Sequence, residues 1–102
     1  MPLTEKKLAE LAELTVEMLG AARAGDWESV AALEEQRQAV IAAKCRGPLA
    51  DPATARRRLE EMSVRNAAIL KAVMAARELA RSELEGLAKG SRAVAAYAQH
   101  AG

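Results

Sequence analysis

The chain has 102 residues, of which 51% are hydrophobic but only 2% aromatic, and its formal net charge is +1. That length suits one compact domain, so we expect residues 1–102 to form a single domain. The nearly neutral charge argues against a nucleic-acid-binding module, which usually gathers excess cations on one face. The longest uninterrupted apolar stretch, residues 93–98, is far shorter than the roughly 20 residues of a membrane span. The amino-terminal segment does not look like a secretory signal, so a cytoplasmic protein is expected.

The first predicted helix covers about residues 4–24. Thr4 is a suitable N-cap, although Lys7 stands where a capping box would have Glu or Gln. Apolar residues then recur at steps of three and four, which is the period of an amphipathic helix; they are Leu8, Leu11, Ala12, Met18, Leu19 and Ala22. Gly25 and Asp26 predict a turn after it, because glycine disfavours a helix interior and aspartate is a favourable N-cap.

The second predicted helix covers residues 27–44. Its expected inward-facing side chains are Trp27, Val30, Leu33, Val40 and Ile41. Trp27, beside the turn, is expected to staple the first helix to the second. Gly47 and Pro48 then end this helix, and Asp51 followed by Pro52 combines an N-cap with a proline at the first helical position.

The third predicted helix runs from residue 52 to about residue 89, much longer than the other two. Its apolar positions form a wide arc, which allows contact with two neighbours. Gly90 and Ser91 predict its end, with a short tail helix at residues 91–99 that folds back to be stable. The expected fold is therefore all-α: an antiparallel three-helix hairpin or bundle with one long third helix and a short carboxyl-terminal tail helix.

The sequence offers no catalytic constellation. Cys45, the single cysteine, and His100, the single histidine, are far apart in the chain, and nothing predicts that they meet. No metal-ligand spacing and no glycine-rich phosphate loop is found, so neither a metal nor another cofactor is expected. The glutamates on the predicted helices lack the spacing of a di-metal site and are expected to be solvated. We expect a protein that is not an enzyme.

Three consecutive cations, Arg56-Arg57-Arg58, stand near the start of the third predicted helix. Consecutive residues fan around a helix, so these three cannot form one tight cluster. Three interpretations remain open for them: solvated surface, contact with an acidic partner, and contact with DNA.

Two parts of the sequence resemble the FliT-type flagellar export chaperones. Residues 18–34 contain a helix end and the turn Gly25-Asp26-Trp27, followed by a second helix with an acidic residue and a leucine. Residues 69–87 form a long helical segment with Arg77-Glu78-Leu79, and an Ala-Tyr pair follows at Ala96-Tyr97. The turn, at its distance from Tyr97, carries most of the resemblance.

The resemblance implies a cytoplasmic helical chaperone for flagellar type III export. Such a chaperone binds the carboxyl-terminal helical segment of the filament-cap protein, keeps that subunit monomeric and delivers it to the export apparatus. Some members of the family also bind the flagellar master regulator or the export ATPase complex. A carboxyl-terminal helix in the family can cover the binding surface. Tyr97 lies on the tail that is expected to dock, and it is predicted to be either a latch or a contact residue.

A groove for an amphipathic helix needs a wide apolar surface, and methionines adapt such a surface to irregular partners. The predicted groove combines side chains from the second and third helices: Val30, Leu33, Val40, Ile41, Met62, Ile69, Leu70, Val73 and Met74. Some of these are expected to be ordinary core.

Other functions compete with the chaperone. A generic coiled-coil dimerisation protein would need a strict seven-residue repeat, which Asn66, Arg77 and Glu83 interrupt. A small regulator that contacts nucleic acid through Arg56–Arg58 is opposed by the net charge. A homodimer is left open.

Overall fold

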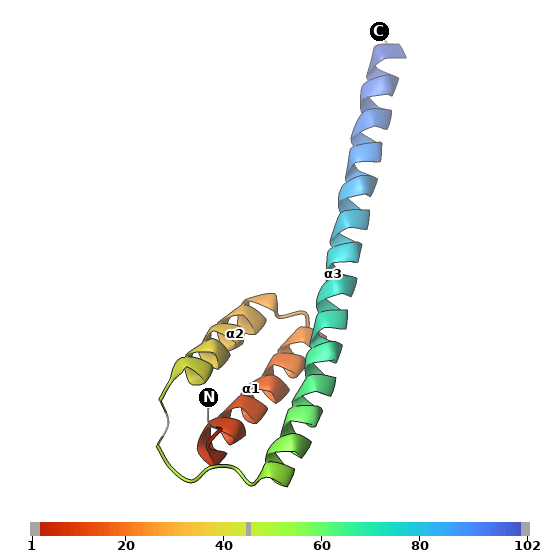
Figure 1. Ribbon diagram of the computed structural model, residues 1–102. Coiled ribbons are helices and arrows are strands. Elements are labelled where there is room, and N and C mark those ends of the chain that lie inside the picture. The colour runs from red at the N-terminus through yellow and green to blue at the C-terminus, as the bar shows by residue number, and fades with distance from the viewer. Residues whose placement is uncertain (1–2, 45, 101–102) are drawn as a thin grey trace. The chain divides into compact units, whose positions relative to one another are not determined.

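The computed structural model describes residues 3–44 and 46–100, and within them the fold is three α-helices and no strand. The helices are α1 (Glu5–Arg23), α2 (Trp27–Ala42) and α3 (Pro52–His100) (Figure 1). The predicted all-α class is therefore confirmed. The chain divides into two compact units, residues 1–72 and 73–102, and the boundary falls within α3.

The ends of the helices follow the predicted capping residues. The Thr4 hydroxyl accepts a hydrogen bond from the Lys7 N–H at 3.1 Å, and α1 begins at Glu5, directly after Thr4. Asp26 caps α2 by accepting from the Ser29 N–H at 3.1 Å, and Asp51 caps α3 by accepting from the Thr54 N–H at 3.1 Å. These three caps satisfy amide groups that a helix start would otherwise leave unpaired.

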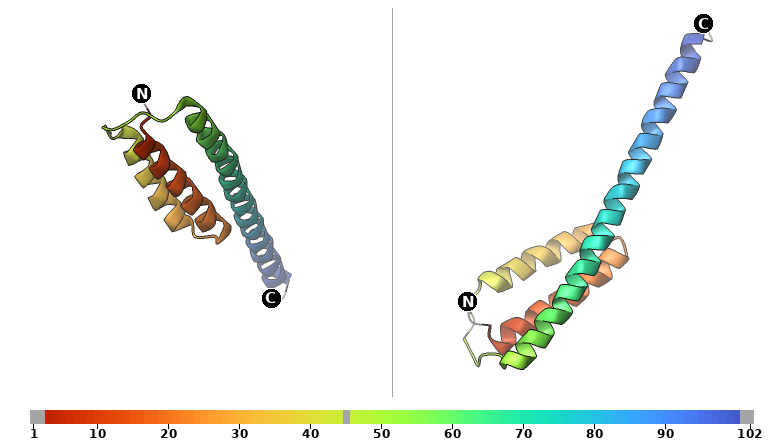
Figure 2. Two further views of the ribbon diagram at one scale, coloured as in Figure 1. Left: turned by 90° about the horizontal axis from the view of Figure 1, so that it is seen from below. Right: turned by 45° about the vertical axis from the view of Figure 1, so that its right-hand side comes forward.

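The turn between α1 and α2 is a Schellman motif. Gly25 has a φ of +73°, the left-handed conformation that glycine adopts without a steric penalty. The Asp26 N–H donates to the Ala21 carbonyl at 2.9 Å, and the Gly25 N–H donates to the Ala22 carbonyl at 3.1 Å. The chain therefore reverses tightly, and α1 and α2 lie side by side (Figure 2).

The core of the first unit depends on α1. Its buried apolar side chains are Leu8, Leu11, Met18 and Ala22. Leu8 and Leu11 pack with Met62 of α3 in one cluster, and Val40 of α2 packs against that cluster. Thus α1 packs against α2 and against the first part of α3.

Helix α2 differs from the prediction. None of its side chains is fully buried: Val30, Leu33 and Val40 are half-buried, while Trp27 and Ile41 are exposed. The helix is rich in alanine and glutamate, and its apolar residues spread around the cylinder instead of forming one narrow stripe. It covers one side of α1 and leaves part of its own apolar surface open.

A short clasp joins the start of α1 to the loop before α3. The Glu5 N–H donates to the Pro48 carbonyl at 3.0 Å, and the Ala50 N–H donates to the Leu3 carbonyl at 3.0 Å. Thr4 and Leu49 thereby form an isolated antiparallel bridge. The clasp fixes where α3 starts relative to α1.

The predicted end of the third helix at residue 89 is wrong, and no separate tail helix forms at residues 91–99. Helix α3 continues through Gly90 and Ser91 to His100. One glycine disfavours a helix by only about 1 kcal/mol, and the residues around it are mostly good helix formers. A single Gly-Ser pair is therefore insufficient to end a long helix.

The second unit contains only the carboxyl-terminal part of α3. From residue 77 to residue 99 every side chain is exposed, including Leu79, Leu84, Leu87 and Val94. Within the described part of the chain, no helix is long and apolar enough to cross a membrane.

Candidate functional site

An open groove in the first unit lies between α2 and the first turns of α3, with α1 as its floor. Its volume is about 340 Å³. Leu11 and Thr15 of α1, both buried, form the floor. The walls come from the two flanking helices: Arg37, Gln38 and Ile41 from α2, and Leu59, Met62, Ser63 and Asn66 from α3.

This groove brings together two of the residues predicted from the sequence, Ile41 and Met62. Ile41 is 41% exposed, and Leu59 on the opposite wall is 44% exposed. Met62 is buried and belongs to both the core and the groove lining. The groove therefore presents apolar side chains to solvent above a packed core.

The polar side chains of the groove are held in defined positions. The Arg37 guanidinium donates to Asn66 Oδ1 at 2.6 Å and also pairs with Glu34. The Thr15 hydroxyl donates to the Leu11 carbonyl at 2.8 Å, so this buried hydroxyl is satisfied within its own helix. The contact between Arg37 and Asn66 links α2 to α3 and fixes one stretch of the groove wall.

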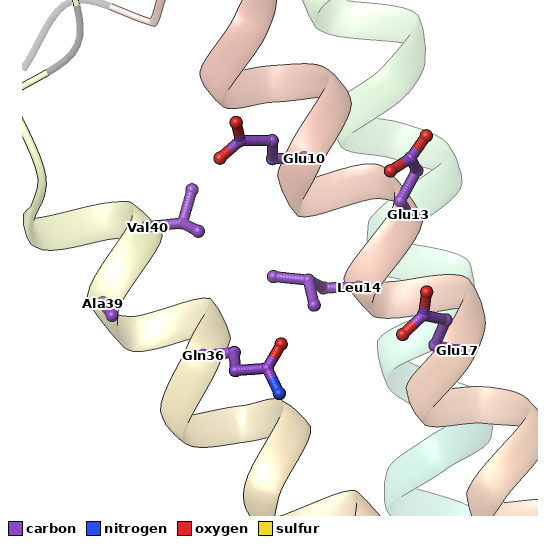
Figure 3. Close-up of a pocket in the computed structure, with 7 residues that line it drawn as sticks. All are labelled: Glu10, Glu13, Leu14, Glu17, Gln36, Ala39 and Val40. Carbon is purple, nitrogen blue, oxygen red and sulfur yellow. The ribbon is translucent and has the colours of Figure 1, made fainter.

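The other predicted groove residues lie in different settings. Ile69 is buried core, Leu70 is 59% exposed, and Val30 and Leu33 are half-buried on α2. Val40 lines a second pocket, between α1 and α2 (Figure 3). In the second unit, Val73 is half-buried and Met74 is exposed.

Tyr97 belongs to the second unit and is 77% exposed. The fold-back that was predicted for the tail is absent here, because α3 is continuous through this segment. The role of Tyr97 as a latch or a contact residue stays a prediction.

Seven of the nine residues that line the groove were not predicted to do so, and three features of the site show why. Thr15 could have been found, because it continues the three-and-four series of Leu8, Leu11, Met18 and Ala22. Arg37 and Asn66 gave no such signal, since their pairing depends on how α2 and α3 are placed. Lys7 was also missed: it is buried, and its ammonium donates to the Ile41 carbonyl at 3.0 Å near the end of α2.

The residues that line the groove include no histidine, cysteine or acidic side chain. Within residues 3–44 and 46–100, no group of three or more histidine, cysteine or acidic side chains is placed to hold a metal ion. Cys45 and the side chain of His100 lie outside the described residues. Apolar contact with another polypeptide is what this arrangement can supply.

The three arginines at the start of α3 have separate surroundings. Arg56 pairs with Glu60 at 3.3 Å on the exposed surface, Arg57 is exposed, and Arg58 is half-buried. Their different exposures agree with the fan expected from consecutive helical positions.

Comparison with known proteins supplies the family. Among curated proteins and solved structures no match to the chain was found. The family model described as flagellar protein FliT matches residues 5–99, which span all three helices. The chain therefore belongs to the FliT family, whose general role is that of a flagellar export chaperone.

Proposed function

We propose that this chain is a cytosolic chaperone that binds the carboxyl-terminal helical segment of the flagellar filament-cap protein. In this role it keeps the cap subunit monomeric and delivers it to the type III export apparatus. Family membership supports the export-chaperone role in general. The observation that carries the specific proposal is the open apolar groove between α2 and α3.

The groove has the features that an amphipathic helix requires. Such a helix inserts apolar side chains at three- and four-residue spacing into a hydrophobic channel. Ile41 and Leu59 offer partly exposed apolar walls, and Met62 provides an adaptable base. Fully burying one large aliphatic side chain contributes about 1.5–3 kcal/mol, whereas micromolar binding requires about 8 kcal/mol beyond the cost of association, so contacts along several turns of the partner helix are needed.

We assign the wider binding surface to the exposed apolar residues on both sides of this groove. Leu70 of α3 extends it toward the carboxyl end of the first unit, where it is exposed. Ile69 supports the surface from the core.

The test is a calorimetric titration of a peptide from the carboxyl-terminal helices of the host's filament-cap protein. Wild type is expected to bind with micromolar affinity or better. Leu59→Glu places a charge in the groove wall and is expected to weaken binding at least about tenfold, because burying an unpaired carboxylate is strongly unfavourable. Val64→Glu is the matched control, since Val64 is also exposed on α3 but does not line the groove.

The proposal fails if folded wild type does not bind the peptide. The placement of the site fails if Leu59→Glu and Val64→Glu bind equally well. Circular dichroism establishes that both variants retain their helices.

A second candidate function, helical dimerisation, is favoured by the second unit. Leu84 and Leu87 are exposed there, together with Leu79 and Val94. An exposed apolar helix can pair with a second copy. Sedimentation velocity distinguishes this function: a dimer that becomes monomeric in Leu84→Glu, Leu87→Glu would establish it, whereas a wild-type monomer would exclude it.

A further inference from the structure

The first unit carries a second groove on a different face of α1, between α1 and α2. Its volume is about 370 Å³ (Figure 3). Leu11 and Thr15 of α1 face the groove described above, whereas this one is lined by Leu14 and its neighbours. Its lining residues are Glu10, Glu13, Leu14, Glu17, Gln36, Ala39 and Val40.

The floor of this second groove is apolar and one side of it is acidic. Leu14 points from α1 toward α2, where Ala39 and Val40 complete the apolar part (Figure 3). Glu10, Glu13 and Glu17 stand along α1 at the spacing that places residues on one helix face. Glu10 points toward α2, whereas Glu13 and Glu17 stand on the side of α1 away from α2, so the carboxylates border the groove over two turns of α1 (Figure 3).

These three carboxylates form no direct ion pair with a described cation. In the described part of the chain none of them forms an ion pair, although glutamates elsewhere do, such as Glu34 with Arg37. Arg58 lines an adjoining pocket with Glu13 and Glu17 but makes no salt bridge to either. Like charges three and four residues apart destabilise a free helix, so this row opposes folding until a cation approaches.

We propose that this acidic groove docks a basic amphipathic helix of a partner protein. The apolar floor accepts one or two aliphatic side chains from the helix, and the glutamates pair with lysines or arginines beside them. Charge complementarity selects this occupant, because the same row repels acidic helices and anionic surfaces. The groove is separate from the one assigned to the cap protein, so the two proposals stand or fall independently.

The probe is a synthetic helical peptide with leucines on one face and lysines beside them. A matched peptide has glutamate in place of every lysine. Fluorescence anisotropy is expected to show binding of the lysine peptide, weakening as salt is raised, and no binding of the glutamate peptide. Equal binding of both peptides would overturn the proposal.

Substitutions locate the site. Glu10→Gln, Glu13→Gln, Glu17→Gln is expected to weaken binding of the lysine peptide about tenfold or more. The same triple variant is expected to be slightly more stable than wild type, because the repulsion along α1 is removed. Glu60→Gln, Glu61→Gln, Glu83→Gln on α3 changes the net charge equally and is expected to alter the affinity by less than about twofold.

Ala39→Lys tests the apolar floor without removing a carboxylate. Ala39 is exposed on α2, and lysine is a good helix former, so the variant is expected to fold. This variant should bind the lysine peptide at least about fivefold more weakly than wild type, because the new side chain fills the groove and repels the lysines of the peptide. Ala31→Lys, on α2 but outside the groove, should bind as wild type does.

The outcomes decide the proposal. Equal weakening by the two triple variants would show nonspecific attraction to net charge and would overturn it. Self-association of wild type that is lost in Glu10→Gln, Glu13→Gln, Glu17→Gln would instead make a second copy of this chain the occupant, and would equally overturn it.

Discussion

The two units of this chain share one helix but hold their structure in different ways. In the first unit, Leu8 is 1% exposed and packs with Leu11 of the same helix and with Met62 of α3. In the second unit, every side chain from residue 77 to residue 99 is exposed. Helices without tertiary packing depend on propensity and on local pairs, which are individually weak. The first unit is therefore stabilised by tertiary packing, whereas the second unit depends on local helix formation.

The largest effect is expected from Leu8→Ala. Removing a fully buried leucine should lower the free energy of unfolding by about 3 kcal/mol, through lost burial and a residual cavity. Leu84→Ala, in the second unit, should change it by less than about 0.5 kcal/mol, because Leu84 is already exposed. Urea denaturation followed by circular dichroism measures both. Similar losses in the two variants would contradict the contrast between the units.

Lys7→Met should have the next largest effect. The Lys7 side chain is buried, and its ammonium donates to the Ile41 carbonyl near the end of α2. Methionine keeps most of the volume but leaves that carbonyl without this donor, so a loss of about 1–3 kcal/mol is expected. Lys6→Met, on the exposed neighbour, is the control and should be nearly neutral in the same urea experiment.

The same substitution, glycine to alanine, can be made in both units to compare how each responds to a better helix former. Apart from the backbone of the surrounding helical turns and the two chain neighbours, no atom lies within 4 Å of a Cβ added at Gly20 or Gly90, so alanine fits at both positions. Gly20→Ala in α1 should raise the global free energy of unfolding by about 0.5–1 kcal/mol. Gly90→Ala should raise only the helicity and amide protection of residues 73–100, leaving the unfolding of the first unit unchanged. A global gain from Gly90→Ala would mean that the two units unfold together.

The smallest effect concerns pH and the cap of α2. The Ser29 hydroxyl, and then the Ser29 N–H, hold the pKa of Asp26 below its ordinary value of 3.8. Since the folded state favours the carboxylate, its stabilising effect is present above pH 3.8 and is lost as the pH falls through the lower folded value. The stability difference between wild type and Asp26→Asn should therefore shrink in acid, as thermal melts at neutral and low pH would show. A difference that grew in acid would contradict this role of Asp26.

Local signals in the sequence were sufficient for the all-α class and for the starts of the three helices. The caps Thr4, Asp26 and Asp51 and the turn at Gly25 act within a few residues of their own positions, so reading them required no tertiary information. The apolar series of α1 likewise identified its buried face. By contrast, the continuity of α3 through Gly90 depended on a balance between one glycine and many helix formers. A prediction that ends a helix at each glycine does not account for this balance.

The groove was predictable only in part. Ile41 and Met62 were identified because each is apolar on its own helix, and the structure places both in one groove. The sequence could not separate Ile69, which is buried, from Leu70, which is exposed, since both follow the same local pattern. Arg37 and Asn66 are far apart in the chain, and only the packing of α2 and α3 brings them together.

The most direct test of the proposed chaperone function is amide hydrogen exchange on the chain alone and with the cap-protein peptide bound. The free chain should show its strongest protection in α1, and fast exchange in residues 77–100. Added peptide should slow exchange in the segments that line the groove, residues 37–41 and 59–66. Peptide that binds while leaving these segments unchanged would contradict the groove assignment, and no change anywhere at saturating peptide would contradict the proposed function itself.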